Sequence, residues 1–230
     1  VTAKLNCGSV IAICGPNGAG KSTALGCLAG LILPDRGLLS VGGKRVIELP
    51  SVLRAQTIGY LPQSADVAWD LSVEALVSLG RLPWRGAPAH EAQSAIDMAL
   101  EAMELEPLRH RPISRLSGGE RARTLMARVL ATKPDWILAD EPLAALDLAH
   151  ARTLMRQFQY QAQEGRGVVL VLHDLATAMN YADRVLVLEN GRLVADGPPA
   201  HALSEAVIKQ VWKVSAQWHG ANGARALAIQ

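Results

Sequence analysis

Short apolar runs alternate with segments of helical periodicity along most of the chain. Strand candidates lie at 9–14 (SVIAIC), 58–63 (IGYLPQ), 135–140 (DWILAD) and 167–173 (GVVLVLH), and the last three end in polar or titratable residues. Strands that alternate with helices are typical of an α/β fold with a largely parallel sheet. Because the carboxyl ends of parallel strands meet at one edge of the sheet, ligands tend to bind there.

Two glycine-containing turns predict antiparallel pieces beside this sheet. Gly42-Gly43 separates LLSV from KRVI, and Asn190-Gly191 lies in the middle of RVLVLENGRLVADG (184–197). The first residues, VTAKL, read as a further strand, and the tail after Pro198 predicts one helix around 204–212 followed by weak signals.

Residues 72–110 have a different character from the rest of the chain. SVEALVSLG and HEAQSAIDMALEAMEL have helical spacing, and Pro83 and Pro88 lie between them. We interpret 65–113 as a mostly helical insertion into an α/β core formed by 1–64 and 114–230. A linker between independent domains is not evident.

Composition sets outer limits on function. The chain has 230 residues, of which 50% are hydrophobic, so it can bury a sizeable core. The 23 basic and 21 acidic residues are too evenly balanced to favour nucleic acid as a partner. No run of 18 apolar residues predicts a membrane span. Cys7, Cys14 and Cys27 lack CxxC spacing, and we expect them to be reduced thiols.

The stretch GPNGAGKS (15–22) matches the phosphate-loop pattern G-x-x-x-x-G-K-[ST]. Its glycines allow backbone N–H groups to curl around phosphate oxygens, Lys21 adds a positive charge, and the Ser22 hydroxyl can reach Mg²⁺. A glycine turn that matches by chance is the alternative. The position between a predicted strand and a predicted helix favours nucleotide binding.

A second anion-binding feature lies far along the chain, in SRLSGGERAR (114–123). Ser117, Gly118 and Gly119 stand at the start of an amphipathic helix, where free backbone N–H groups attract anions. One nucleotide does not need two such helix starts, so the pair of sites requires an explanation.

Four polar residues stand at predicted strand ends: Gln63, Asp140, Glu141 and His173. Asp140 suits contact with Mg²⁺, and Glu141 suits orienting or deprotonating a water molecule. Individually they have ordinary alternatives, since the acids could occupy a solvated loop and the histidine could be structural. Together with a phosphate loop they indicate a catalytic edge.

These residues resemble the ATP-binding-cassette (ABC) ATPases over essentially the whole chain. The phosphate loop, Gln63, LSGGE (116–120), ILADE (137–141), ALD (145–147) and His173 occur in the family's order and spacing. LSGGE is the family signature, and a GTPase or small-molecule kinase with the same phosphate loop lacks it. The resemblance implies a P-loop NTPase (RecA-like) α/β core with a mostly parallel sheet, an antiparallel β portion and an inserted helical subdomain.

The resemblance also implies a role for each motif. Glu141 corresponds to the catalytic glutamate, His173 to the histidine on the γ-phosphate, and Gln63 to the residue that touches Mg²⁺ or the attacking water. Ser22, Gln63 and Asp140 would serve Mg²⁺, and Asp147 would cross a dimer interface. ATP would be held by Gly15, Pro16, Asn17, Gly18, Ala19, Gly20, Lys21, Ser22 and Thr23 of one subunit and by Ser117, Gly118 and Gly119 of the other.

A head-to-tail homodimer of this kind explains the two anion sites, because each signature reads the γ-phosphate held by the partner. The implied partners are integral-membrane permease subunits and, indirectly, a substrate-binding protein, which places the chain peripherally at the cytoplasmic face of an inner membrane. LPQ (61–63), SLGRLPW (78–84) and LDLAH (146–150) look most like importers of siderophores, haem or cobalamin. The alternative for GRLPW is a simple turn between two helices.

Other functions remain open at this stage. A soluble mechanical ABC ATPase usually has coiled coils or two cassettes, a non-hydrolysing regulator would lack Glu141 or His173, and an exporter or another importer branch would share the same motifs. Two departures from the family pattern, Leu143 and Ala139, stand where no chemistry is expected. The family's adenine-stacking aromatic residue would lie upstream of Val1, where we expect the natural start of the chain.

Overall fold

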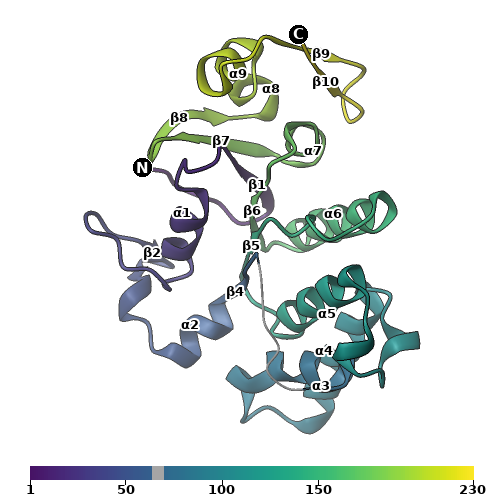
Figure 1. The fold of residues 1–230 in the computed structure, drawn as a ribbon. Coiled ribbons are helices and arrows are strands. Elements are labelled where there is room, and N and C mark those ends of the chain that lie inside the picture. The colour runs from purple at the N-terminus through teal and green to yellow at the C-terminus, as the bar shows by residue number, and fades with distance from the viewer. Residues whose placement is uncertain (64–69) are drawn as a thin grey trace.

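A computed structural model describes residues 1–63 and 70–230 of the chain. Its main element is a six-stranded sheet with the order β4-β5-β6-β1-β7-β8 (Figure 1). The first five strands are parallel, and β8 pairs antiparallel with β7. Their bounds are β1 Ser9–Cys14, β4 Ile58–Leu61, β5 Trp136–Asp140, β6 Gly167–Val171, β7 Arg184–Glu189 and β8 Arg192–Gly197. The predicted α/β fold with a mostly parallel sheet is confirmed.

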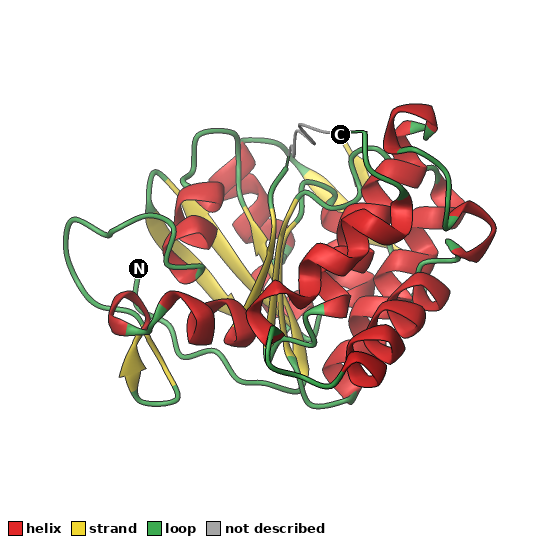
Figure 2. Ribbon diagram, turned by 90° about the horizontal axis from the view of Figure 1, so that it is seen from below, coloured by secondary structure: helices red, strands yellow, loops and turns green. Residues whose placement is uncertain are grey.

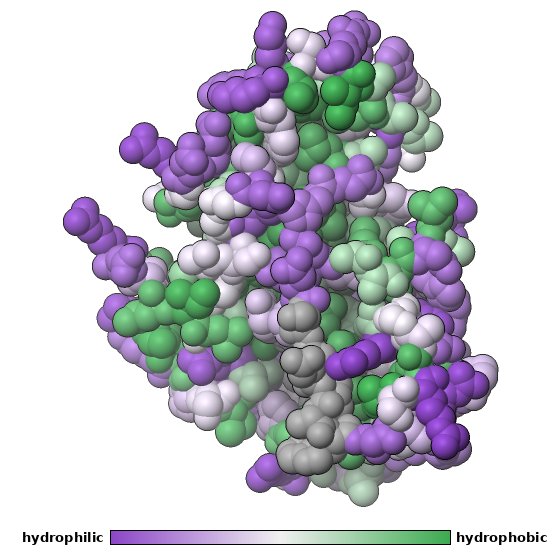
Figure 3. Space-filling view, in the orientation of Figure 1, coloured by the Kyte–Doolittle hydropathy of each residue, from purple (hydrophilic) through white to green (hydrophobic). Residues whose placement is uncertain are grey.

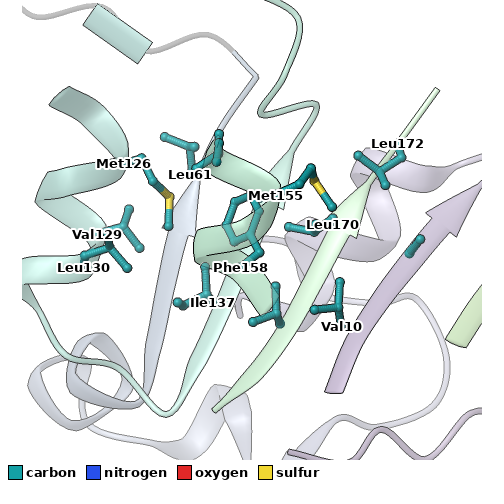
Figure 4. Packing of buried hydrophobic residues seen from close by; sticks show 14 of the residues in the cluster. Val10, Leu61, Met126, Val129, Leu130, Ile137, Met155, Phe158, Leu170 and Leu172 are labelled. Carbon is teal, nitrogen blue, oxygen red and sulfur yellow. The ribbon is translucent and has the colours of Figure 1, made fainter. Parts of the chain in front are cut away.

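Helices cover both faces of the sheet (Figures 1 and 2). Alternation along β1 explains why, since Val10 and Ala12 enter one buried cluster while Ile11 and Ile13 enter another. The first cluster includes side chains of α5 (Gly118–Ala131) and α6 (Leu148–Gln163), and the second includes side chains of α1 (Lys21–Leu28). Figure 4 shows Phe158 of α6 packed in the first cluster. Helices α1 and α5 therefore lie on opposite faces.

The predicted helical insertion contains α3 (Val73–Ser78), the 3₁₀-helix η2 (Leu79–Trp84) and α4 (Ala89–Ala102), with 3₁₀ turns η3 (Glu106–Leu108) and η4 (Ile113–Arg115). Side chains of α3, α4 and α5 share one buried cluster. The Ser72 hydroxyl caps α3 by accepting a hydrogen bond from Ala75 N–H. Arg109 joins the region by pairing with Glu74, Asp97 and Glu106. The first residues of the predicted insertion, 65–69, lie outside the described residues.

Both glycine turns form the predicted antiparallel hairpins. Gly42-Gly43 joins β2 (Ser40–Val41) to β3 (Lys44–Arg45), and Asn190-Gly191 joins β7 to β8. The remaining helices are η1 (Val46–Glu48), α2 (Ser51–Thr57), α7 (Leu175–Tyr181), α8 (Pro199–Ala202) and α9 (Glu205–Trp212). In the described part of the chain, no helix has both the length and the apolar character needed to cross a bilayer.

Two sequence-based expectations at the ends of the chain differ from the structure. VTAKL forms no strand, because residues 1–5 pair with no other strand in the described ranges; a strand needs a neighbour to satisfy its backbone. The tail has the predicted helix, α9, but also a hairpin of β9 (Ala216–His219) and β10 (Ala226–Ile229) that the sequence signals missed. Trp218 secures this hairpin, as its Nε1–H donates to the Leu203 carbonyl at 2.8 Å.

The surface carries apolar side chains on one side of the molecule. Figure 3 shows such an area on the side where α2 and β2 lie in Figure 1. Exposed large apolar residues in and around these elements include Leu31, Leu33, Leu38, Val52 and Leu53. Apolar surface of this kind is a common feature of protein–protein contacts.

Candidate nucleotide site

The phosphate loop connects β1 to α1 and is braced by the β7–β8 hairpin. A Cβ at Gly15 would overlap the Leu188 carbonyl oxygen, so only glycine fits there. The N–H of Gly191 donates to the Ala19 carbonyl at 3.0 Å. Gly20 has a φ of 90°, a left-handed conformation that glycine adopts without steric cost. The shape of the loop thus depends on Leu188 and Gly191, which lie much later in the sequence. The adjoining strand is held in the same way, since Val10 N–H donates to Asp183, 173 positions away.

Lys21 is 6% exposed and folds over its own loop. Its Nζ donates to the carbonyls of Gly15 and Pro16, at 2.9 and 3.1 Å. Helix α1 has no acidic residue in its first turn and no side-chain cap among the described residues. Its first N–H groups and the lysine therefore form a positive cradle that suits phosphate oxygens, with the exposed Ser22 and Thr23 next in the helix.

Asp140 ends β5 at the edge where β1 runs into the phosphate loop. The residue is 4% exposed, and its Oδ1 accepts no hydrogen bond within the described ranges. A buried carboxylate without a partner is costly unless a cation compensates it. Burial, and secondarily the Asp140 charge, raises the pKa of the nearby Tyr60 phenol. This orphaned oxygen fits a divalent cation that a few protein oxygens and substrate phosphates share, which is how Mg²⁺ binds.

Glu141 directly follows β5 and contacts residues that follow the two neighbouring strands, β4 and β6. Its Oε2 accepts a hydrogen bond of 2.8 Å from Gln63 Nε2, beyond β4, and its Oε1 pairs with His173 Nε2, beyond β6. The Glu141 N–H donates to the Val171 carbonyl at 3.2 Å. Its φ of 50° is unusual for a residue with a side chain, and such strain is concentrated at functional sites. The structure therefore brings together three of the four predicted strand-end residues in one hydrogen-bonded group.

The signature residues form a well-capped helix start. Ser117 Oγ accepts from Glu120 N–H at 3.2 Å, and Ser117 N–H donates to Glu120 Oε2 at 2.7 Å, which is a capping box. The hydrogen bond from Ser117 N–H holds the pKa of the Glu120 carboxyl below its usual value. Among the described residues, no atom outside the helix's own backbone and the two neighbouring residues lies within 4 Å of a Cβ built on Gly118. Helix α5, which begins at the signature, and helix α1, which begins in the phosphate loop, cover opposite faces of the sheet.

Asp147 directly precedes α6, a short turn after Glu141. Its carboxylate caps the helix by accepting from His150 N–H at 2.9 Å, and it also contacts the His150 ring. The hydrogen bond from the His150 backbone and then that from its ring hold the pKa of Asp147 below its usual value. A Cβ on Gly119 would lie 3.5 Å from the Ala145 carbonyl oxygen, so the signature packs against this turn.

Sequence reasoning missed two supports of the site. One is the contact between the predicted β7–β8 hairpin and the phosphate loop, which no local signal could reveal because it joins residues far apart in the sequence. The other is Asp174, whose carboxylate accepts from Ala176 and Thr177 N–H at the start of α7 and so fixes the chain beside His173. That cap could have been found, because an aspartate just before a helical segment is a standard start signal.

A strand, phosphate loop and helix, with an acid pair at the end of β5, a parallel strand separated from β1 only by β6, define a P-loop nucleoside triphosphatase. The family model described as "ABC transporter" matches residues 1–144. The chain belongs to the ABC transporter family and is an ATP-binding ATPase of that family.

Relatives and solved structures agree with this assignment. The chain is 43% identical to the hemin import ATP-binding protein HmuV of Streptomyces coelicolor, covering 92% of this chain and 76% of that protein. It is 36% identical to the petrobactin import ATP-binding protein FpuC of Bacillus anthracis, over 91% of this chain and 79% of that protein.

Two solved structures show the same fold. An inward-facing ABC transporter assigned to the metal-chelate type has a TM-score of 0.82 at 27% identity, covering 100% of this chain and 88% of that one. The dimeric bacterial ABC transporter cassette MJ0796 has a TM-score of 0.79 at 28% identity, covering 86% and 89%.

Proposed function

We propose that this chain is the ATP-hydrolysing subunit of a bacterial importer whose cargo is an iron chelate such as haem or a siderophore. The observation that carries the proposal is the hydrogen-bonded group of Glu141, Gln63 and His173 beside the phosphate loop, which equips the chain for hydrolysis. The cargo class is supported by relatives named as hemin and petrobactin import proteins. Cobalamin, the third cargo considered from the sequence, has less support.

In the proposed reaction, the backbone of residues 15–23 and the Lys21 side chain hold the phosphates of ATP. Ser22, Gln63 and the orphaned Asp140 oxygen would hold Mg²⁺, which neutralises phosphate charge when bound. A Glu141 carboxylate oxygen orients the attacking water and takes its proton, and His173 Nε2 donates a hydrogen bond to the γ-phosphate. Both groups exchange their present mutual contact for these partners.

The proposed assembly is a head-to-tail homodimer that closes on two ATP molecules. Its support is the placement of α1 and α5 on opposite faces of the sheet, together with the dimeric MJ0796 cassette among similar structures. Ser117, Gly118 and Gly119 then serve the partner's γ-phosphate, and Asp147 lies at the interface. Hydrolysis removes the group that bridges the subunits, so the dimer opens.

We further propose that residues 65–113 form a subdomain that docks permease subunits, while 1–64 and 114–230 form the core. Exposed Leu79 and Leu82 on η2 and Val52 on α2 suit an apolar partner surface. A substrate-binding protein would act through the permease. This arrangement places the chain at the cytoplasmic face of the inner membrane, as a peripheral subunit.

Growth on defined iron sources tests the cargo. Deletion of the coding sequence in the native host should abolish growth on haemin or a ferric siderophore while growth on ferrous salt continues. The wild-type sequence should restore growth, and the Glu141→Gln sequence should not. Normal uptake of all such chelates by the deletion strain would overturn the importer proposal.

A further inference from the structure

The carboxyl end of α5 is capped by side chains from η2. Arg81 Nη1 donates to the Ala131 carbonyl at 2.9 Å, and Trp84 Nε1 donates to the Thr132 carbonyl at 2.8 Å. The last carbonyls of a helix have no partner inside the helix, so each donor satisfies an otherwise unpaired group. The Arg81 guanidinium carbon also lies 5.4 Å from the Trp84 ring centroid. We call residues 79–84 the capping segment.

A glycine allows this segment to reach the helix. A Cβ on Gly80 would overlap the Arg128 carbonyl oxygen and lie 3.2 Å from the Ala131 Cβ, so any side chain would push the segment away. At Gly86, six residues later, such an atom would have no contact within 4 Å in the part of the chain that the structure describes. The glycine, arginine and tryptophan of SLGRLPW thus all serve one contact, which is more than a turn between helices requires.

The capping segment also touches the elements that lead to the catalytic edge. Gln56 of α2 donates from Nε2 to the Pro83 carbonyl at 2.8 Å, and α2 runs directly into β4, which leads to Gln63. A Cβ on Gly59 of β4 would lie 2.8 Å from side-chain atoms of Pro134 and Val129, so β4 packs directly on the end of α5. From there the chain continues into β5.

Helix α5 therefore begins at the signature residues and is held at its carboxyl end by hydrogen bonds from the capping segment. Its amino end carries the signature, and its carboxyl end leads into β5, which ends at Asp140, directly before Glu141. The helix has 14 residues, so the two ends are about 20 Å apart at about 1.5 Å per residue. A small tilt at the capped end displaces the signature end by a larger amount.

We propose that Arg81 and Trp84 are positioning residues that fix α5 against α2 and β4, and so set how the signature meets the partner's nucleotide. The inference rests on the proposed head-to-tail dimer. Loss of either donor leaves the phosphate loop unchanged, so ATP binding to the monomer persists. The ATP-driven association of two chains weakens, because the signature is presented less accurately.

The test uses Trp84→Phe, which removes the N–H donor and retains an aromatic ring. Trp218→Phe is a matched control, because Trp218 Nε1 also donates to a backbone carbonyl at 2.8 Å and is also half-buried, but in the C-terminal hairpin. Both changes are made in a Glu141→Gln background, and dimers are quantified by analytical ultracentrifugation with Mg-ATP. ATP affinity of the monomers and urea unfolding are measured in parallel.

We expect both variants to lose similar stability and to bind ATP equally. The dimer dissociation constant should rise about tenfold for Trp84→Phe, which carries the lesion in two subunits, and stay unchanged for Trp218→Phe. Arg81→Met should behave like Trp84→Phe, and Arg81→Lys, which retains a donor, should recover part of the loss. Gly80→Ala should weaken the dimer, and Gly86→Ala should not.

Equal dimerisation of Trp84→Phe and Trp218→Phe would overturn the positioning role. If Trp84→Phe does not fold, equal dimerisation of Arg81→Met and the parent overturns it in the same way. Failure of the Glu141→Gln parent itself to dimerise would instead refute the head-to-tail assembly, and the positioning proposal with it. The two failures are therefore distinguished by the parent alone.

Discussion

Gln63 donates a 2.8 Å hydrogen bond to Glu141, although 78 residues separate the two in the sequence. The bond fixes one carboxylate oxygen, and His173 fixes the other. The backbone strain at Glu141, with its φ of 50°, is of a kind that costs about 1–3 kcal/mol and is retained where function needs it. The Glu141 carboxylate is thus held in place by three separate segments of the chain.

Glu141→Gln should separate ATP binding from hydrolysis. Glutamine retains the shape and a carbonyl acceptor but cannot take a proton from water, so turnover should fall by about 10²–10⁴. ATP binding should persist, and size-exclusion chromatography with Mg-ATP should show accumulated dimers. Glu164→Gln, an exposed change at the end of α6, is the control and should hydrolyse ATP normally. Near-normal turnover of Glu141→Gln would remove this residue from its role.

Damage to the two anion sites should complement between chains. Lys21→Ala removes the phosphate-loop charge, and Gly119→Asp places a repelling carboxylate at the signature. Each variant alone should fail to dimerise with ATP, whereas a mixture should form heterodimers that contain one intact site. Ultracentrifugation of differently labelled chains measures this directly. A mixture that stays monomeric at every ratio would show that the signature does not act on the partner's nucleotide.

Asp140→Asn should stabilise the nucleotide-free protein and abolish its response to Mg²⁺. Removal of an unpartnered buried charge should raise the free energy of unfolding by on the order of 1 kcal/mol. ATP stabilises the chain by binding the folded state, and the further stabilisation that Mg²⁺ adds to ATP in the wild type should disappear in the variant. Urea unfolding with ATP, in the presence and absence of Mg²⁺, checks both parts. A variant that gains as much stability from Mg-ATP as wild type would contradict the metal role.

The Arg184–Asp196 pair between β7 and β8 should make stability depend on acid pH. Two hydrogen bonds of 2.6 and 2.7 Å to Arg184 hold the pKa of Asp196 below its usual value. The unfolded chain therefore binds this proton more readily, so the pair stabilises above about pH 4 and its contribution is lost as pH falls further. Asp196→Asn should lower the free energy of unfolding at neutral pH by about 1 kcal/mol. A difference from wild type that does not shrink in acid would exclude this pair as the cause.

Local patterns predicted most of the fold and which residues lie together at one edge of the sheet. Apolar runs placed β1, β4 and β5 to within a residue or two, and the phosphate loop and LSGGE identified both helix starts. The alternation of strands with helices predicted a parallel sheet, and so predicted that the polar residues at the strand ends lie at one edge. At that edge Gln63 and His173 both contact Glu141.

The failures have a common physical cause. VTAKL has strand-like composition but no neighbouring strand, and composition cannot supply one. The β9–β10 hairpin depends on contacts such as that of Trp218 with Leu203, which lie outside its own sequence. Likewise, the sequence around SLGRLPW does not indicate that Arg81 and Trp84 donate to carbonyls at the end of α5. Those carbonyls lie 50 and 48 positions further along the chain.

The brace behind the phosphate loop determines when during synthesis the chain becomes able to hold ATP. The loop and β1 leave the ribosome before β6 and β7, yet β1 lies between those two strands, and Gly15 lies against Leu188. Until residues 167–191 have been made, the strand has neither neighbour and the loop has no support. Residues 1–144, which carry the family match, therefore lack both strands that flank β1, and we expect them neither to fold nor to hold nucleotide on their own.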